Sequence, residues 1–287
     1  MTTKRLQALM AITMGLLITI VMELSLVVAG VPYKLFFDWW LGRLVPSPLE
    51  KVPKWWSWMI VHVCLQGILG MHCEITRRVR TLGTVVVEGN HPSTLGLIVF
   101  VYFVTHHIAP RVLIVLKQEH RWHPVLGPTL WLINGGIFID RDDHEAAIKT
   151  IQEGVAKRSR FRRAIVILSD RHRPTRARID AARVQFMKIL GEAPKELHVL
   201  FPDQGGTFNI TEATGFQLPL IDLTIGLSIF EEGDDDLPLK CGETWSVDAE
   251  DVSDVAPHTL TEFGPWIARR WVNFKNPFIG RRRRLHP

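Results

Sequence analysis

The sequence predicts an α/β protein in which a mixed, largely parallel sheet is flanked by helices and preceded by one or two membrane-associated helices. Three observations support this: a long apolar run near the N-terminus, short β-branched runs alternating with helical windows from residue 82, and polar motifs where several of those runs end. Alternating strands and helices are typical of parallel sheets, because each crossover between parallel strands needs a long connection. We expect a membrane-anchoring region at 1–80, an α/β domain at 81–265 and a basic tail at 266–287.

Composition favours a membrane partner over a nucleic acid. The 287 residues include 34 Lys and Arg and 29 Asp and Glu, and seven of the cations follow Glu262, the last acid. The rest of the chain is therefore close to neutral, whereas a nucleic-acid groove needs cations spread over a binding face. A cationic tail suits an anionic lipid surface. The three cysteines form no CxxC pair, which indicates reduced thiols in a cytoplasm-facing protein rather than a disulfide framework.

Two apolar segments precede the α/β region. Residues 8–30 are interrupted chiefly by Glu23 and are long enough to cross a bilayer. Lys4 and Arg5 resemble the start of a signal peptide, but the apolar run is too long for one, so we predict an uncleaved anchor. A second run, 55–75, begins with three tryptophans and could span, re-enter or lie against the membrane. We favour a hairpin that returns to the cytoplasmic face, so that the α/β domain faces the cytoplasm.

Local patterns place the remaining elements. Short β-branched runs predict strands at 84–87, 112–115, 136–139, 164–168, 198–201 and 220–227. Length and composition predict helices at 143–158 and 175–190, the first with Asp142 or Asp143 as its N-cap. Polar motifs follow four of the strands, at the edge where open α/β sheets bind their ligands.

The first two motifs have a chemical and a purely structural interpretation. His91 follows strand 84–87 and precedes a helix start, a position suited to a general base; alternatively, Asn90 or Ser93 caps that helix and His91 is incidental. Arg141 ends the strand at 136–139 behind Asp140, where it could hold a phosphate or form an ordinary ion pair.

Two further motifs follow later strands. Residues 167–175 run from a strand through Asp170 and Arg173 into a helix, and residues 201–207 contain Gly205 and Gly206. Glycine pairs permit a positive φ or a close backbone approach to a ligand, although both motifs could be turns and nothing more. Glu119, His120 and His123 lack a third ligand at metal spacing, so we expect no metal site.

Read together, these motifs resemble the lysophosphatidic acid acyltransferase (PlsC-like glycerolipid acyltransferase) family, from about residue 85 to 227. Asn90, His91 and Ser93 match the family's Asn-His-x-Ser-x-x-x-Asp block. The segment from Lys117 to Arg141 resembles the family stretch that ends in a phosphate-contacting Ile-Asp-Arg. The family's Phe-Pro-Glu-Gly-Thr-Arg block is altered here and keeps an acid and a final arginine, while 201–206 resembles its fourth block.

The resemblance implies a membrane-bound O-acyltransferase that moves a fatty acyl group from acyl-CoA or acyl carrier protein to lysophosphatidic acid or another lysophospholipid. It implies no metal or redox cofactor and no nucleic acid. The catalytic residues carried over are His91 as general base, Ser93 and Asp170. The substrate-binding residues carried over are Asn90, Arg141, Arg173, Lys117, Gly205 and Gly206. Arg171 and His172 in the altered block leave a larger headgroup or a glycolipid open as the acceptor.

The chain departs from the family pattern at one position. Gly96 stands where the family has the Asp that orients the histidine. In a serine-protease triad, losing the orienting acid costs about 10⁴ in kcat. Three explanations stay open: Asp170 or Glu119 replaces the acid in space, the enzyme is slow, or the protein is a catalytically inactive lipid binder.

Overall fold

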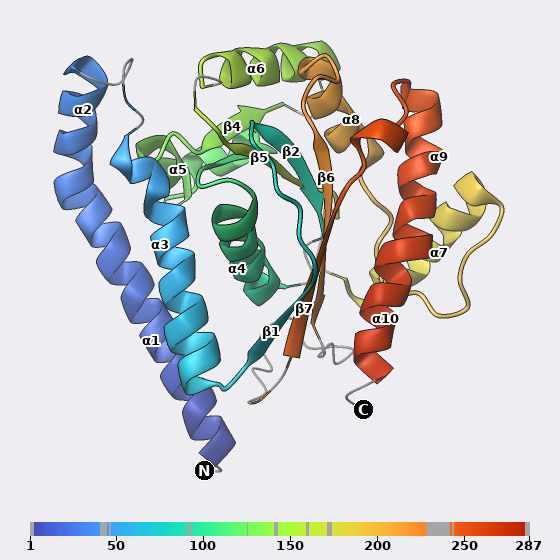
Figure 1. The fold of residues 1–287 in the computed structure, drawn as a ribbon, viewed down its shortest axis with the longest axis horizontal. Helices are drawn as coiled ribbons and strands as arrows, with labels where there is room; N and C mark the ends of the chain where they lie inside the picture. The colour runs from blue at the N-terminus through green and yellow to red at the C-terminus, as the bar shows by residue number, and fades with distance from the viewer. Residues whose placement is uncertain are drawn as a thin grey trace. The chain divides into compact units, whose positions relative to one another are not determined.

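The structure is a computed structural model and describes residues 3–40, 45, 47–90, 93–124, 126–140, 143–158, 161–170, 174–227, 242 and 244–284. Seven strands form one sheet in the order β1-β7-β6-β2-β5-β3-β4 (Figure 1). The pairs β1–β7, β2–β6, β3–β4 and β3–β5 are parallel, and β6–β7 is antiparallel. The predicted fold class, a mixed and largely parallel sheet with flanking helices, is confirmed.

The chain divides into two compact units, which we describe separately. The first comprises Met1–Leu69, Arg80–Val85 and Val101–Val166, and the second comprises Gly70–Val79, Val86–Phe100 and Ile167–Pro287. Helix α4 (Thr94–Phe103) begins in the second unit and ends in the first.

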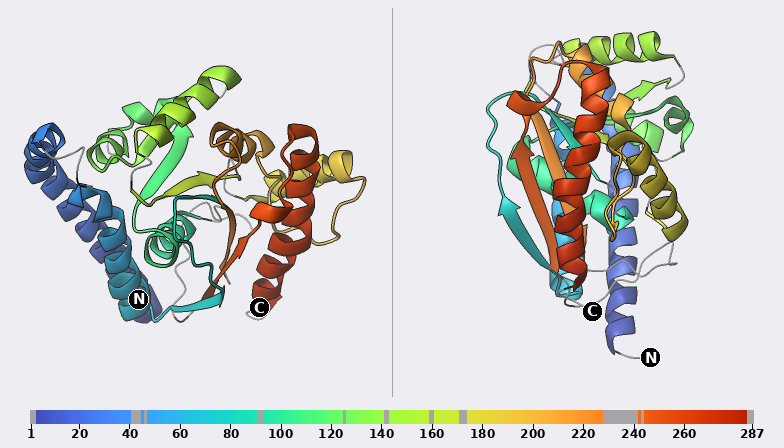
Figure 2. Two further views of the ribbon diagram at one scale, coloured as in Figure 1. Left: turned by 45° about the horizontal axis from the view of Figure 1, so that its top comes forward. Right: turned by 90° about the vertical axis from the view of Figure 1, so that its right-hand side faces the viewer.

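A helical hairpin forms the N-terminal part of the first unit. Helix α1 (Thr3–Ser25), the π-helical turn η1 (Leu26–Gly30) and α2 (Val31–Trp40) form one continuous run. Helix α3 (Val52–Met59) and the π-helical η3 (Ile60–Ile68) pack back along α1, where Trp56 donates to the Thr19 hydroxyl at 3.2 Å (Figures 1 and 2). The two apolar segments therefore pair with each other.

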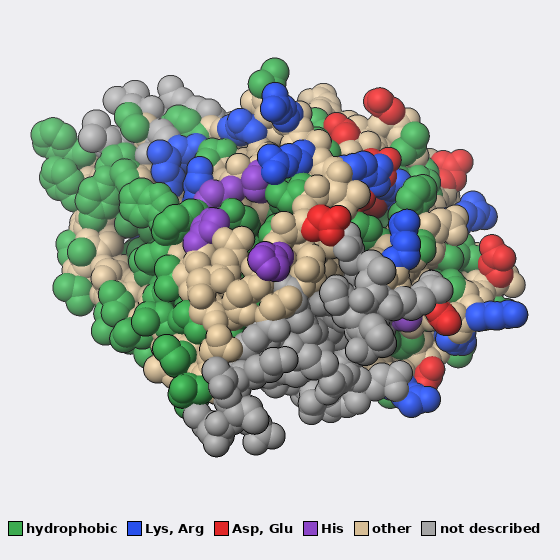
Figure 3. All heavy atoms as spheres, turned by 60° about the horizontal axis from the view of Figure 1, so that its bottom comes forward, with side chains coloured by type: hydrophobic (Ala, Val, Ile, Leu, Met, Phe, Trp, Pro, Cys, Tyr) green, Lys and Arg blue, Asp and Glu red, His purple; other side chains and the backbone are tan. Residues whose placement is uncertain are grey.

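Apolar side chains cover the outside of this hairpin. Leu6–Phe37 is 32 residues long and has a mean hydropathy of 2.3 in its most apolar stretch, of which 11% is buried. In Figure 3 hydrophobic side chains gather over these helices. It is the one helix in the described part of the chain that is long and apolar enough to cross a membrane. This exposure suggests membrane association, because soluble proteins rarely expose so large an apolar surface.

The rest of the first unit is built on parallel strands whose side chains are largely buried. Its strands are β3 (Val112–Lys117), β4 (Gly136–Ile139) and most of β5 (Ala164–Leu168). Its other helical elements are η2 (Pro48–Lys51), η4 (Val104–Ile108), η5 (Gln118–Trp122), α5 (Leu126–Leu132) and α6 (His144–Ala156). Asp143 caps α6, because its carboxylate accepts from the Ala146 N–H at 2.9 Å. Of the two N-cap candidates in the sequence, Asp142 and Asp143, the structure therefore selects Asp143.

The second unit joins the other strands to the C-terminal helices. Its strands are β1 (His72–Arg77), most of β2 (Val85–Gly89), β6 (Leu220–Leu227) and β7 (Thr244–Asp251). Its helices are α7 (Arg176–Leu190), α8 (Gln204–Ala213), η6 (Ser253–Val255), α9 (Leu260–Arg270), η7 (Trp271–Lys275) and α10 (Asn276–Arg284). The last three form one helical run that packs against β6 (Figures 1 and 2).

Three expectations from the sequence need correction. The predicted strand at 198–201 is a loop, because the His198 N–H is taken by the Asn276 side chain at 2.6 Å and Pro202 follows. The second apolar run does not continue to residue 75, since η3 ends at Ile68 and β1 begins at His72. The basic tail expected at 266–287 is part of a helical run as far as Arg284, where α10 ends.

Candidate active site

Three segments of the second unit meet where β2 and β5 end. The Ser169 N–H donates to the Gly89 carbonyl at 3.0 Å, and the Asp203 N–H donates to the Ser169 carbonyl at 2.6 Å. The Ser169 and Thr207 hydroxyls are 2.9 Å apart and fully buried. The carboxyl ends of two strands and the start of α8 are thus held together, at the edge where the sequence predicts a ligand site.

Asn90 anchors the chain that leaves β2. Its side-chain amide donates to the Ile225 carbonyl at 2.9 Å, and its side-chain oxygen accepts from the Ile225 N–H at 2.8 Å. The side chain is buried and pairs with β6 as another strand residue would. Asn90 therefore does not cap the next helix, and its amide holds the backbone that leads to residue 91. His91 itself lies outside the described residues.

Ser93 caps helix α4. Its hydroxyl accepts from the Gly96 N–H at 3.0 Å, and its carbonyl accepts from the Leu97 N–H at 3.0 Å. Ser93 is therefore the helix cap that the structural interpretation of the first motif allowed. Gly96 is buried in the first turn of α4, at the position where the family pattern has its carboxylate.

Asp170 follows β5 and is 5% exposed. The side chains of two preceding residues, Ile167 and Ser169, indicate which side of the sheet Asp170 faces. The Ile167 side chain lies against α8, where a Cβ on Gly206 would be 2.7 Å from its Cδ1 atom, and the Ser169 hydroxyl meets Thr207 of α8. Alternation of side chains along a strand, continued past the end of β5 at Leu168, would place the Asp170 side chain on the side away from α8. Gly89 faces that same opposite side, because a Cβ there would overlap the Phe100 ring of α4.

A second carboxylate at this junction was not among the residues predicted from the sequence. Asp203 occupies the N-cap position of α8, and its carboxylate lies over the first turn, 3.7 Å from where a Cβ on Gly206 would be. The signal in the sequence was a single Asp between Pro202 and the Gly pair. Gly205 and Gly206 have no positive φ; Gly206 instead allows close packing against Ile167.

The predicted cations are only partly described. Lys117 ends β3 and is exposed, and it stands in register with Ile139, the last residue of β4. The chain that leads to Arg141 therefore starts beside Lys117. Arg141 and Arg173 lie outside the described residues, as do Arg171 and His172. Glu119 is exposed in η5 of the first unit. Within the described ranges, no group of three or more His, Cys, Asp or Glu side chains could hold a metal ion.

A buried charge cluster lies on the other face of β2, and sequence reasoning missed it. Lys275, with 0% of its side chain exposed, binds Glu88 at 2.8 Å and Asp222 at 2.7 Å. Glu88 also accepts from the Trp271 indole N–H at 3.2 Å, and Arg270 pairs with Asp222. Burial raises the pKa of Glu88 to about 7 against the opposing effect of Lys275. Burial would raise the pKa of Asp222 as well, but Lys275 and Arg270 hold it below its ordinary value.

Comparison with known proteins supports the class. Residues 70–168, which include β2, the Asn90 anchor and all of β5, match the family model described as Acyltransferase. The chain thus contains an acyltransferase domain, over about a third of its length. Among solved structures, the chain is similar to the 1-acyl-sn-glycerophosphate (LPA) acyltransferase PlsC from Thermotoga maritima, with 14% identity over 91% of this chain and 97% of that chain and a TM-score of 0.44. A comparison with curated proteins finds no match.

Proposed function

We propose that this acyltransferase moves a fatty acyl group from a thioester donor, acyl-CoA or acyl carrier protein, to the hydroxyl of lysophosphatidic acid or another lysophospholipid. The observation that carries the proposal is the junction of Gly89, Ser169 and Asp203, which brings the Asn90 anchor and two carboxylates to one edge of the sheet. Open α/β sheets bind their ligands at this edge. The exposed apolar helix Leu6–Phe37 keeps the enzyme at the bilayer, where such acceptors are found.

His91 acts as general base in this proposal. It takes the proton of the acceptor hydroxyl while the oxygen attacks the thioester carbonyl. The C–S bond then breaks, the thiolate leaves with the proton returned by the imidazolium, and an ester bond has formed. Arg141, Arg173 and Lys117 bind the acceptor phosphate through charge-assisted hydrogen bonds. The N–H groups of Gly205 and Gly206, in the first turn of α8, offer positive ends of peptide dipoles to the substrate.

Asp170 replaces the carboxylate that is missing at Gly96. Asp170 is buried at the end of the strand beside β2, on the side of the sheet that Gly89 and α4 share. Asn90, the residue before His91, is held at the end of β2, the strand next to β5 in the sheet. Glu119, the other candidate from the sequence, is exposed in η5 and has no comparable support. A buried carboxylate that accepts from the imidazole N–H stabilises the imidazolium formed during the reaction.

The test is an acyltransferase assay of purified protein in nanodiscs with labelled acyl-CoA and lysophosphatidic acid. We expect turnover in the wild type, none in His91→Ala, and a kcat in Asp170→Asn lower by about 10² to 10⁴. Adding Gly96→Asp to Asp170→Asn should restore part of that loss, and Asp203→Asn serves as the matched control. A larger kcat loss in Asp203→Asn than in Asp170→Asn would assign the orienting role to Asp203 instead.

The alternative is a lipid-binding relative without catalytic activity, and the observation that favours it is Gly96 in the first turn of α4. Binding of lysophosphatidic acid without turnover in the wild type, together with turnover gained in Gly96→Asp alone, would establish it. Turnover with a glycolipid or a larger lysophospholipid, but not with lysophosphatidic acid, would keep the reaction and change the acceptor.

A further inference from the structure

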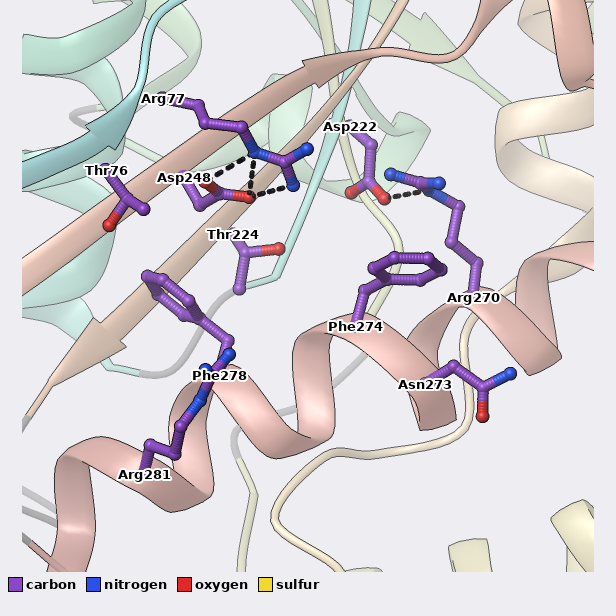
Figure 4. Close-up of a pocket in the computed structure, with 10 residues that line it drawn as sticks. All are labelled: Thr76, Arg77, Asp222, Thr224, Asp248, Arg270, Asn273, Phe274, Phe278 and Arg281. Carbon is purple, nitrogen blue, oxygen red and sulfur yellow. Dashed lines mark hydrogen bonds and ion pairs between the residues drawn. The ribbon is translucent and has the colours of Figure 1, made fainter.

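A cavity of about 160 Å³ lies between the C-terminal helical run and strands β1, β6 and β7 of the second unit (Figure 4). It shares no residue with the proposed acyl-transfer site. The residues that line it are Thr76, Arg77, Asp222, Thr224, Asp248, Arg270, Asn273, Phe274, Phe278 and Arg281. A cavity of this size is below the range of about 300–1,000 Å³ that is usual for drug-sized ligands, so it suits a headgroup-sized molecule.

The carboxylates in the wall already have cationic partners. Asp248 receives Arg77 in a bidentate pair, with Nε at 2.9 Å and Nη2 at 2.6 Å. Asp222 receives Lys275 at 2.7 Å and also Arg270. Glu250, which is not part of the lining, pairs with both Arg77 and Arg270. A cationic ligand would therefore find no unsatisfied carboxylate in this lining.

The other polar groups in the wall can all donate hydrogen bonds, although the hydroxyls and the amide among them can also accept. Among the described residues, Arg281 donates only its Nε, to the Pro277 carbonyl at 3.3 Å, which leaves its two terminal amino groups without a partner there. Within the described part of the chain, the side chains of Thr76, Thr224 and Asn273 make no hydrogen bond. Thr224 is 5% exposed, so its hydroxyl has little solvent other than this cavity.

The mouth of the cavity has an apolar side. Phe274 and Phe278 project from one side of the C-terminal run toward the strands (Figure 4), and Phe274 is 50% exposed. The Arg270 guanidinium lies 4.8 Å from the Phe274 ring, which holds that ring in place. A ligand here would meet both polar side chains and the two aromatic rings of the helical run.

We propose that this cavity is a second anion site, separate from the acyl-transfer site, which binds a phosphate ester. A phosphate presents several acceptor oxygens in different directions, which matches a guanidinium, an amide and two hydroxyls better than a carboxylate does. The ester substituent lies against Phe274 and Phe278. The phosphate ester comes either from a soluble molecule such as glycerol 3-phosphate or from the headgroup of an anionic phospholipid.

The test uses a readout at single arginines, so that phosphate bound elsewhere does not register. Full-length protein in phosphatidylcholine nanodiscs is treated with phenylglyoxal, and modification of Arg281 and Arg269 is followed by peptide mass spectrometry. Arg269 is the matched control, because it is exposed on the same helical run and lies outside the cavity. Glycerol 3-phosphate is compared with sodium chloride at equal ionic strength. A parallel arm replaces part of the phosphatidylcholine with phosphatidic acid.

We expect glycerol 3-phosphate to slow modification of Arg281 by at least about fivefold and to leave Arg269 unchanged. Thr224→Val, which removes one donor at nearly constant volume, should raise the concentration needed for protection by about the same factor. Protection by phosphatidic acid nanodiscs alone would identify the lipid headgroup as the source. Equal protection of both arginines, protection by chloride, or no effect of Thr224→Val would overturn the proposal.

Discussion

Asn90 shows how one side chain can position a reacting loop without taking part in the chemistry. Its amide completes two hydrogen bonds to Ile225 that a further strand residue would otherwise make. Both bonds are buried, so neither partner has water as a substitute. The consequence is a backbone fixed to β6 one residue before His91.

Asn90→Asp keeps the shape, replaces the donor to the Ile225 carbonyl by an acceptor oxygen and adds a buried negative charge. A carboxylate oxygen would then face a carbonyl oxygen in a buried setting. We expect the free energy of unfolding to fall by about 1–3 kcal/mol, measured by urea denaturation in detergent. Asn273→Asp, an exposed Asn on the C-terminal run, is the control and should leave stability nearly unchanged. Equal stability of the two variants would contradict this role of Asn90.

At the scale of elements, helix α4 can lie close to strand β2 because residue 89 is a glycine and has no side chain. Gly89 ends β2, and a Cβ at this position would overlap the Phe100 ring on α4. The helix that Ser93 caps therefore packs directly on the backbone of the strand that precedes the proposed base.

Gly89→Ala should displace α4 and lower the free energy of unfolding by about 1–3 kcal/mol, the usual cost of overpacking. Phe100→Leu makes room for the new methyl group, so the double variant should lose less stability than the sum of the two single variants. Denaturation of all four proteins completes the cycle. Additive losses would show that Gly89 and Phe100 do not constrain each other.

The N-terminal helices give a second prediction at this scale. Val28 lies in η1 and is 74% exposed, whereas Val184 is 68% exposed on α7 of the second unit. A lysine inserted into hydrocarbon costs about 2.5–3.5 kcal/mol near the bilayer centre. Val28→Lys should therefore lower co-sedimentation with lipid vesicles, while Val184→Lys should not. A similar loss in both variants would argue against membrane insertion of this helix.

At the scale of the whole molecule, the C-terminal helical run places a lysine against two buried carboxylates of the sheet. Lys275 joins Glu88 and Asp222, and it is 187 residues from Glu88 in sequence. Removing one partner of a buried ion pair costs about 3–5 kcal/mol because a buried charge is left without compensation. The basic C-terminal region is thus partly a structural element, since two of its cations lie inside the fold.

This cluster makes stability depend on pH. Burial raises the pKa of Glu88 from 4.5 to about 7, so between these values the folded chain keeps a proton that the unfolded chain releases. The favourable contribution of this Glu88 proton to the free energy of unfolding is complete below pH 4.5 and is lost as the pH rises to about 7. Glu88→Gln removes this dependence, so the free energy of unfolding of the variant minus that of the wild type should increase as the pH rises from 4.5 to about 7. The absolute value of this difference also includes the cost of leaving Lys275 without its Glu88 partner.

Urea denaturation at several pH values checks the Glu88→Gln prediction, with the exposed Glu192→Gln as control. The difference in free energy of unfolding between Glu88→Gln and the wild type should grow with pH, while that of the control stays constant. Parallel pH profiles for wild type and Glu88→Gln would show that Glu88 does not titrate in this range.

Features that depend on short-range pattern could be read from the sequence. The β-branched runs gave β3, β4, β5 and β6, and the Asn-His-x-Ser block after β2 indicated the acyltransferase class that the family match supports. Strand β7 was missed because its sequence is rich in polar and acidic residues. The run at 198–201 has strand composition but packs in a loop, where the Asn276 side chain, rather than a neighbouring strand, binds its backbone.

The sequence by itself determined the α/β class, the apolar N-terminal helix and the motif order, because each follows from residue types that lie close together in the chain. Only the tertiary structure decided that Asn90 binds Ile225, that Asp203 joins Ser169, and that Lys275 lies between two buried carboxylates. These pairings join residues far apart in sequence. Their energies come from burial and geometry, which no local pattern encodes.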